Sequence, residues 1–480
     1  MNIRFIQYVL GALLFIEGGL LALPVVVSLL YGERDMLPIL YSSAIAFVTG
    51  GAFWYFNRNC SKEIEKREGF IIVSFVWIVY AFFGALPFVF SGYIPSFSDA
   101  FFEAMSGFTT TGSTILTDIE ALPHGLLFWR AFMQFTGGIG ILVLSIAVLP
   151  IFGMGNMMIY QAEMSGAAVG GRFSPRIKDT ARHIFHIYLI LTVACILFYL
   201  PDMDFFDAIT HAFSTTATGG FSTRNASMGA FSAYSQYVTI VFMLLGSFSF
   251  VLFFYVWKRD FKKVAADDEF RFYLLIIFIA SVFICAGLLL NSHDVEPSVR
   301  ESLFTVTSIV STTGYAVNDY MQWSPPLWFI LFLLAFIGGC AGSTAGGLKM
   351  VRFLLLFRLM PVQFKKIIHQ NAIIHVKMNS QTVPGDRMYR TLSFFMTFLC
   401  IYTAGVFVLM ICGLNFTSAA GASIACLGNT GPGLDAVGPA GNFSALPAVG
   451  KWTCSLLMLL GRLELYSVLI LLSPAFWKRQ

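Results

Sequence analysis

The sequence predicts an all-α membrane protein in which four pseudo-symmetric repeats, each helix–pore helix–filter–helix, surround one pore, with an additional two-helix unit at the N-terminus. Three observations lead to this prediction. Hydrophobic residues make up 57% of the 480 residues and charged residues only 12%, whereas a soluble domain carries about 25% charged residues. Long apolar segments recur along the whole chain. A Thr-Gly pair occurs four times between such segments.

The long apolar segments define the predicted membrane helices. A spanning helix needs about 20 mostly apolar residues, and ten segments reach or approach that length: 5–30, 37–56, 70–92, 127–152, 183–200, 234–257, 271–290, 327–357, 390–413 and 452–473. Four further runs are too short to span: 97–110, 204–217, 299–312 and 416–429. Such runs fit re-entrant helices, which are tolerated at membrane depth where protein or a water-filled cavity shields them.

Each short run ends in a loop with a Thr-Gly pair. Glycine allows the crowded or positive-φ backbone that turns a carbonyl inward, and threonine adds a stiff side chain with a hydroxyl oxygen. A ring of backbone carbonyls replaces the water shell of a potassium ion. The predicted ion-binding residues are Thr110, Thr111, Gly112, Ala217, Thr218, Gly219, Thr312, Thr313, Gly314, Asn429, Thr430 and Gly431.

The alternative for any one Thr-Gly pair is an ordinary turn, because both residues are common there. Four pairs at matching places in four hairpins favour a filter instead. The sequence Thr312-Thr313-Gly314-Tyr315 also resembles the filter motif of potassium channels. No charged side chain lies in the core of any loop, which argues against a ring of carboxylates.

The distribution of charge predicts the topology. With a cytoplasmic N-terminus, the cytoplasmic stretches hold 22 of the 30 Lys and Arg residues, the outer stretches hold five, and three lie in membrane segments. The positive-inside rule favours this orientation, which brings all four Thr-Gly loops to the outer side. The outer stretches also carry 14 acidic residues. These form either a cation-attracting mouth or an ordinary solvated face, and Glu103, Asp207 and Glu301 are also explained by helix capping.

A glycine-rich run interrupts the segment 327–357. Five glycines in ten residues make a continuous helix costly, at about 1 kcal/mol per glycine relative to alanine. We therefore expect a broken helix with a loop inside the membrane that gates the pore below the filter. The alternative is a close helix crossing through small residues. The predicted gating residues are Gly338, Gly339, Gly342, Ser343, Thr344, Gly346, Gly347 and Lys349, together with Arg462.

Arg462 lies in the last membrane segment, where a charge is costly and usually faces an interior cavity. It is interpreted either as an electrostatic barrier in a cation pathway or as a member of an ion pair. Glu464, two residues away, is a poor partner for it. Glu17 is a lone acid in the first segment and receives no role.

Other functional classes fit less well. The eight cysteines form no CxxC pair, and no His-Glu-x-x-His or paired-Asp motif suggests an intramembrane enzyme. The sequence therefore predicts no catalytic residues, and potassium at the filter is the only metal ion expected. A sodium- or proton-coupled secondary transporter remains the alternative, although such proteins usually show two inverted halves.

At the level of motifs, the chain resembles the superfamily of TrkH, TrkG and KtrB potassium transporters, and its TrkH branch most closely. The matching segments are Phe128–Gly140, Ala217–Ser222, Gly339–Lys349 and Leu460–Glu464. The resemblance implies an N-terminal two-helix unit at 1–57 and four pore repeats at 68–152, 181–258, 270–358 and 388–474. It also maps the family's filter glycines onto Gly112, Gly219, Gly314 and Gly431, its gating loop onto 338–347, and its pore arginine onto Arg462. Pro432 departs from the other three loops.

The resemblance further implies a setting for the protein. It implies a homodimer in a bacterial cytoplasmic membrane, regulated by a cytoplasmic TrkA-like ring that binds NAD or ATP. The nucleotide would lie on that partner, since no prosthetic group is expected on this chain. The basic stretches Lys258–Lys263 and Arg358–Lys366 would contact the ring or anionic lipid. No nucleic-acid partner is expected.

Overall fold

The computed structural model describes residues 2–61, 66–143, 177–291, 294–370 and 374–478, and the described chain is almost entirely helical. The helices are α1 (Ile3–Leu20), α2 (Ala22–Tyr31), α3 (Met36–Phe56), α4 (Lys66–Ser91), α5 (Phe97–Phe108), α6 (His124–Val143), α9 (Ile177–Tyr199), α10 (Phe205–Thr216), α11 (Ala233–Ser247), α12 (Phe250–Trp257), α13 (Phe261–Ala266), α14 (Asp268–Leu290), α15 (Val295–Val310), α16 (Pro325–Leu334), α17 (Met350–Ile368), α18 (Gly385–Ile411), α19 (Phe416–Leu427), α20 (Ala448–Arg462), α21 (Tyr466–Leu472) and α22 (Pro474–Trp477). One hairpin, β1 (Lys377–Met378) with β2 (Gln381–Thr382), is antiparallel.

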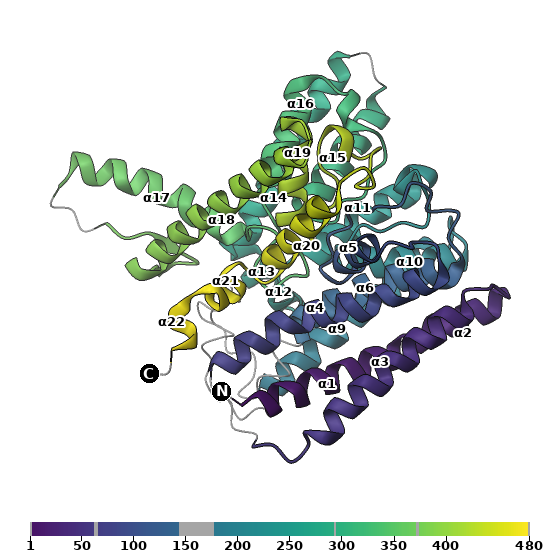
Figure 1. The fold of residues 1–480 in the computed structure, drawn as a ribbon. Coiled ribbons are helices and arrows are strands. Elements are labelled where there is room, and N and C mark those ends of the chain that lie inside the picture. The colour runs from purple at the N-terminus through teal and green to yellow at the C-terminus, as the bar shows by residue number, and fades with distance from the viewer. Residues whose placement is uncertain (1, 62–65, 144–176, 292–293, 371–373, 479–480) are drawn as a thin grey trace.

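The N-terminal helices pack along one side of the molecule (Figure 1). Helices α1 and α3 approach through small residues: a Cβ added to Gly18 would lie 2.5 Å from the Phe47 nitrogen, and one added to Gly50 would lie 2.4 Å from the Phe15 nitrogen. Backbones at such short separation leave room only for glycine, which is how apolar helices associate in a membrane. This pair then packs on α4.

The rest of the chain repeats one order of elements four times. A long helix is followed by a short helix, a loop and an inner helix, in the groups α4–α5–α6, α9–α10–α11/α12, α14–α15–α16/α17 and α18–α19–α20/α21. The short helices α5, α10, α15 and α19 are the four predicted re-entrant runs, and most of their residues are buried. The prediction of an all-helical fold with this repeated order is therefore confirmed.

Two of the four short helices, α10 and α19, begin at a side-chain cap. Asp204 accepts a hydrogen bond from the backbone of Asp207, and Asn415 accepts one from the backbone of Ser418. Asp207 lies in the first turn of α10, as capping predicts. Glu103 does not: it lies in the middle of α5, and its carboxylate is fully buried against Arg130. Glu301 also lies beyond the first turn of α15, where the acidic residue is Glu296. Capping is therefore the wrong explanation for Glu103 and Glu301.

Three of the four inner helices are broken in the membrane. Helices α11 and α12 meet at 97°, and α20 and α21 meet at 118°. Helices α16 and α17 are separated by the glycine-rich segment, so the predicted break in 327–357 is confirmed. The remaining inner helix, α6 of the first unit, runs without a break to Val143. Residues 144–152 of the predicted segment lie outside the described residues.

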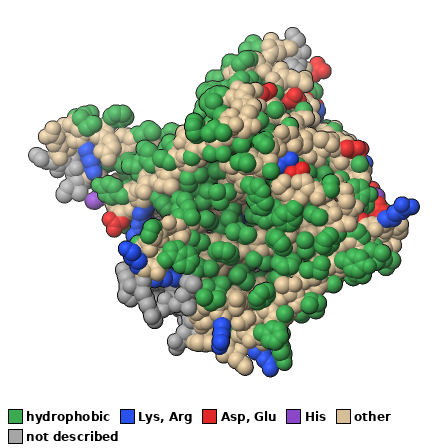
Figure 2. Space-filling model, viewed as in Figure 1, with side chains coloured by type: hydrophobic (Ala, Val, Ile, Leu, Met, Phe, Trp, Pro, Cys, Tyr) green, Lys and Arg blue, Asp and Glu red, His purple; other side chains and the backbone are tan. Residues whose placement is uncertain are grey.

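The surface fits a lipid environment. Within the described residues, six helical spans are long and apolar enough to cross a membrane, and the two bent pairs raise this to eight. Ten spans were predicted, which is more than these eight. The difference arises because α6 and the divided α16–α17 segment do not meet the criteria of length and hydropathy for a span. Figure 2 shows hydrophobic side chains over most of the visible face, with most visible Lys and Arg on the side of the chain termini.

Candidate functional site

The four short helices end in the same backbone motif. The residue two positions beyond the last helical residue adopts a left-handed conformation: Thr110 at φ 51°, Thr218 at 53°, Thr312 at 56° and Asn429 at 51°. The next amide donates to the carbonyl five residues earlier, with N···O distances of 2.8–2.9 Å, in Thr111 to Ser106, Gly219 to Ser214, Thr313 to Ser308 and Thr430 to Ala425. This is a Schellman ending, which usually carries glycine at the left-handed position.

This motif corrects the predicted register of the second loop. Thr218, and not Ala217, is the counterpart of Thr110, while Ala217 is the helix cap. The counterpart of Gly112, Gly314 and Gly431 is therefore Gly220, at φ 80°, and not Gly219. The Thr-Gly pair was misleading in the second loop. Its threonine, Thr218, occupies the position of Thr110 and not that of Thr111, and two glycines follow it.

The four matching glycines form a closed ring of contacts. A Cβ added to Gly112 would lie 2.3 Å from the Gly219 carbonyl oxygen, and one added to Gly220 would lie 1.9 Å from that of Thr313. One added to Gly314 would lie 1.9 Å from the Thr430 oxygen, and one on Gly431 would lie 2.8 Å from the Thr111 oxygen. Each glycine thus makes room for a carbonyl of the next loop: the first loop for the second, the second for the third, the third for the fourth, and the fourth for the first.

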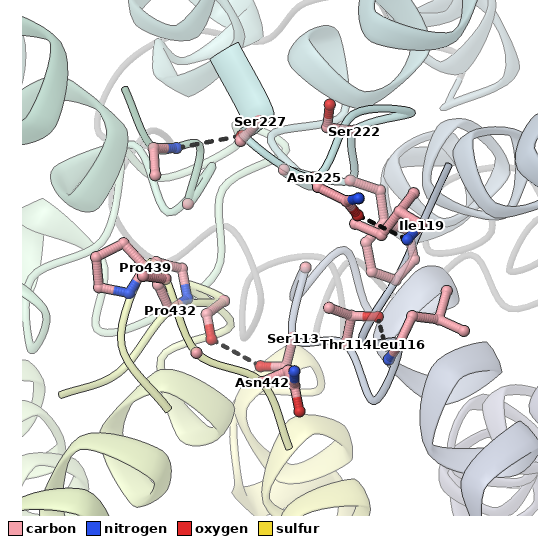
Figure 3. Close-up of a pocket in the computed structure, with 18 of the residues that line it drawn as sticks. Ser113, Thr114, Leu116, Ile119, Ser222, Asn225, Ser227, Pro432, Pro439 and Asn442 are labelled. Atoms are coloured by element: carbon pink, nitrogen blue, oxygen red, sulfur yellow. Dashed lines mark hydrogen bonds between the residues drawn. The ribbon is translucent and has the colours of Figure 1, made fainter. Parts of the chain in front are cut away.

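Hydrogen bonds join the loops at all four seams. The Asn225 side chain accepts from the Ile119 amide at 2.7 Å, and the Ser227 hydroxyl accepts from the Ala316 amide at 3.3 Å. The two other seams are closed by donation to carbonyl oxygens, from the Tyr320 hydroxyl to Gly433 at 2.6 Å and from the Ser113 hydroxyl to Gly431 at 2.8 Å. Three of these contacts are drawn in Figure 3.

A cavity of about 220 Å³ opens on one side of the ring. Its lining includes Gly112, Gly220, Gly314 and Gly431, which again selects Gly220 in the second loop. In Figure 3, side chains from several loops surround this space, including Ser113, Ser222 and Pro432. The cavity is therefore a vestibule built from all four units.

The vestibule lining contains no carboxylate among the described residues. Several of the predicted outer acids are instead engaged with outer bases, in the pairs Arg130–Glu103, Arg224–Asp207, Arg300–Glu296 and Lys451–Asp99. Others accept hydrogen bonds from nearby loops, as Asp435 does from Asn415 and Ser418. An attraction of cations to this face would therefore act from the rim and not from the lining.

The four loops differ in the hydroxyls that support them. In the first loop Thr109 and Thr111 are joined through their hydroxyls at 2.8 Å, and in the third loop Ser311 and Thr313 are joined at the same distance. The second loop has Ala217 and Gly219 at these positions and the fourth has Gly428 and Thr430, so neither forms this pair. The four loops are thus related but unequal.

Gln134 supplies the missing support to the second loop. From α6, its amide nitrogen donates to the Gly219 carbonyl at 2.7 Å, and its oxygen accepts from the Phe221 amide at 3.1 Å and from the Ser214 hydroxyl. It is fully buried. Gln134 is not among the predicted site residues, although a glutamine in a membrane helix was the available signal.

The glycine-rich segment 338–347 lies on the other side of the ring. A bridge between Ile337 and Leu348 closes its base, and the Gly338 amide donates to the Leu348 carbonyl at 2.8 Å. Thr344 and Gly346 of the segment contact three of the four loops. The Thr344 hydroxyl is joined to that of Thr218 at 3.3 Å, and the Gly346 amide donates to the Thr312 hydroxyl at 2.7 Å.

The third contact of the segment is steric. A Cβ added to Gly346 would lie 2.6 Å from the Asn429 Cβ. The segment also bonds the broken inner helix of the second unit: the Cys340 amide donates to Ser247 at 3.0 Å and the Thr344 amide donates to Gly246 at 3.4 Å. The predicted gating segment therefore contacts the second, third and fourth loops directly.

Arg462 is bound to carbonyls and not to a carboxylate. Its guanidinium donates to the Thr344 oxygen at 2.7 Å and to the Gly137 oxygen at 3.0 Å, and the residue is 3% exposed. Within the described residues it belongs to no ion pair, and its printed partners favour the barrier interpretation. Glu464 pairs with Arg352 instead. Lys349 donates to the Ala345 carbonyl.

Several oxygen atoms at the ring have no hydrogen-bond partner. They are buried, and they belong to the side chains of Thr110, Thr430 and Asn429. Unpaired oxygens next to a ring of carbonyls suit a hard monovalent cation better than a soft metal. No group of three or more His, Cys, Asp or Glu side chains that could hold a resident metal occurs in the described part of the chain.

Comparison with known proteins now identifies the family. A family model described as "Cation transport protein", TrkH, matches residues 38–479. The chain belongs to the TrkH family. It is 38% identical to the Trk system potassium uptake protein TrkH of Escherichia coli and 36% identical to that of Halomonas elongata, with both chains of each pair covered in full.

Structural comparison agrees with the family assignment. The crystal structure of the potassium transporter TrkH from Vibrio parahaemolyticus superposes with a TM-score of 0.90 at 35% identity, and the match covers both chains completely. The resemblance stated from motifs is thereby confirmed. The chain is a member of a family of membrane cation transport proteins.

Proposed function

We propose that this protein takes up potassium ions through a selective, gated pore, as the membrane subunit of a Trk-type system. The observation that carries the proposal is the closed ring in which each of four glycines makes room for the carbonyl of the next loop. Carbonyl oxygens from four loops replace the hydration shell of the ion. The names of the family's relatives point to the same substrate.

In this proposal the ion passes through three zones. It enters the vestibule, sheds its water at the carbonyls of Thr111, Gly219, Thr313 and Thr430, and then meets the segment 338–347. With Arg462 bound to the Thr344 carbonyl, a fixed positive charge and a loop together obstruct the path. Movement of the loop opens the pore, so the loop and Arg462 act as the gate.

The filter residues of the proposal are the predicted set with the second loop shifted to Thr218, Gly219 and Gly220. The gating residues are the predicted ones: Gly338, Gly339, Gly342, Ser343, Thr344, Gly346, Gly347, Lys349 and Arg462. The protein is further proposed to be a homodimer in a bacterial cytoplasmic membrane with a cytoplasmic N-terminus, and not an enzyme. Its control by a cytoplasmic nucleotide-binding ring comes from the family resemblance.

The test is ion selectivity in liposomes. Gly314→Ser adds a side chain whose Cβ would lie 1.9 Å from the Thr430 carbonyl oxygen, and we expect the preference for potassium over sodium to fall about tenfold. Gly413→Ser is the matched control, because Gly413 also has a positive φ of 100° but has no atom within 4 Å of an added Cβ. Unchanged preference in Gly314→Ser would contradict the filter assignment.

The alternative of a coupled secondary transporter is distinguished in the same liposomes. With sodium and proton gradients removed one at a time, a pore continues to move potassium down its own gradient. Loss of flux on removal of one coupling gradient would instead favour the transporter. Addition of a TrkA-like ring with NAD or ATP tests the proposed control of the gate.

A further inference from the structure

The glycine-rich segment 338–347 needs anchors to stay in one place. Such a segment loses a large conformational entropy when it is ordered, and at membrane depth each of its backbone polar groups must find a partner. Some anchors come from the ring and the second unit, as described above. One comes from a buried side chain that the proposed mechanism does not yet use, Glu269.

Glu269 joins the segment to the helix that follows it, α17. It lies in the first turn of α14 and is 4% exposed. One of its carboxyl oxygens accepts from the Ala341 amide, in the segment, at 2.7 Å and from the Val351 amide, in the first turn of α17, at 3.1 Å. A single oxygen thus binds two backbone amides, one on each side of Thr344 and Gly346 in the sequence.

The second of these contacts gives a hydrogen-bond partner to an amide in the first turn of α17. The first amides of a helix lack intrahelical partners, and Lys349, the residue that caps α17, makes no side-chain capping bond. Glu269 serves as that cap from another helix. A carboxylate at a helix N-terminus is also stabilised by the helix dipole, so the same contact fixes the point where the segment returns to helix.

We propose that Glu269 is a positioning residue of the gate: it holds the 338–347 segment across the pore, and its loss favours the open position. This inference rests on the proposed function, in which that segment obstructs the ion path. The hydrogen-bond partners of Glu269 are Ala341 and Val351 and not residues of the four loops. Glu269 thus sets how often the gate opens and leaves ion preference unchanged.

The neighbouring Asp268 provides the matched control. It lies in the same turn of α14, but its carboxylate accepts from Arg358 at 2.7 Å and from the Asn379 amide at 2.6 Å. Asp268→Asn therefore changes a carboxylate of the same helix end whose hydrogen bonds go to Arg358 and Asn379 and not to the segment. Glu269→Gln serves as the conservative variant, because its amide oxygen can still accept both backbone bonds.

The first experiment is hydrogen–deuterium exchange on the full-length protein in liposomes. In Glu269→Ala we expect exchange of peptides covering 338–351 to rise about tenfold, because the Ala341 and Val351 amides lose their buried acceptor. Glu269→Gln should lie between this variant and the parent, and Asp268→Asn should match the parent. Unchanged exchange over 338–351 in Glu269→Ala would overturn the proposal.

The second experiment is potassium flux without a regulatory partner. Glu269→Ala should raise basal flux severalfold with an unchanged preference for potassium over sodium, whereas a lost preference would overturn the proposal. A variant with 338–347 shortened separates two failures. If shortening raises flux and Glu269→Ala does not, the role of Glu269 is refuted; if neither raises flux although exchange is faster, the segment is not the gate and both proposals fail.

Discussion

At the residue scale, the four loops place side chains where glycine is usual. Three threonines and one asparagine occupy the left-handed position of a Schellman ending, with φ between 51° and 56°. A β-branched residue in this region is strained by about 1–2 kcal/mol. Such strain persists where the surrounding structure enforces it and is typical of functional sites. Here Thr218 and Thr312 bond to the segment 338–347, which explains why a side chain is retained.

The corrected register of the second loop gives a prediction at this scale. Gly220→Ala adds a Cβ 1.9 Å from the Thr313 carbonyl at a positive φ, so it should lower both potassium flux and potassium preference at least tenfold. Gly219→Ala adds a Cβ against the side chain of Gln134 and not against a backbone carbonyl, and Gly219 is not among the glycines with a positive φ, so it should cost less. Liposome flux with both ions measures the difference.

Gly32→Ala is the control for this comparison. Gly32 has a φ of 68° but no atom within 4 Å of an added Cβ, so this variant carries the backbone strain without the contact. If Gly219→Ala proved more harmful than Gly220→Ala, the original assignment of the Thr-Gly pair would be restored.

At the element scale, the short helices and the broken helices both leave backbone groups near the ring without helical hydrogen bonds. The short helices end at the ring, and three inner helices break near it, so that backbone groups are released from helical bonds. These groups are used again: the carbonyls of Gly246 and Ser247 accept from the 338–347 segment, and the carbonyl of Thr344 accepts from Arg462. At the breaks described here, the irregular backbone thus lies where protein or a cavity receives it.

The start of α19 carries a pH-dependent contact. The pKa of the Asp435 carboxyl is lowered from its ordinary value of 3.8 by hydrogen bonds from Asn415 and Ser418. A lowered pKa contributes stability that is present above the unfolded value and is lost as pH falls through the folded value. The melting temperature of the parent should therefore exceed that of Asp435→Asn at pH 7, and the two should converge below about pH 4.

The melting temperatures of both proteins between pH 3 and pH 7 test this prediction. Because Asp435 is largely exposed, we expect a modest difference. A difference that stayed constant over the whole pH range would show that the carboxylate does not supply it.

At the scale of the whole molecule, the four units depend on one another. Each seam of the ring is closed by a hydrogen bond between different units, and each glycine accommodates the carbonyl of its neighbour. A cation at the ring would add contacts to several units at once. Binding to the folded state alone raises stability in proportion to the logarithm of ion concentration.

We therefore expect potassium to raise the melting temperature of the purified protein, with sodium at equal ionic strength raising it less. At a hundredfold excess over its dissociation constant, one bound ion contributes about 2.7 kcal/mol. Gly314→Ser should lose the potassium effect and Gly413→Ser should keep it. An equal effect of both ions on the parent protein would contradict selective binding at the ring.

The sequence by itself determined the class of fold and most of the candidate site. Hydropathy gave the long helices and the four short ones, because apolar length is set locally by the membrane. The run of glycines located the break in 327–357, because glycine disfavours helix wherever it stands. Arg462 was found because a charge in an apolar segment is conspicuous.

Only the tertiary structure decided which atoms meet. It selected Gly220 over Gly219, because register depends on hydrogen bonds at the helix end and on contact with the third loop. It assigned Arg462 to backbone carbonyls and brought Gln134 and Glu269 to their loops. Composition and local propensity contain no record of such pairings, since each joins residues that are distant in the chain and adjacent only after the four units close around one axis.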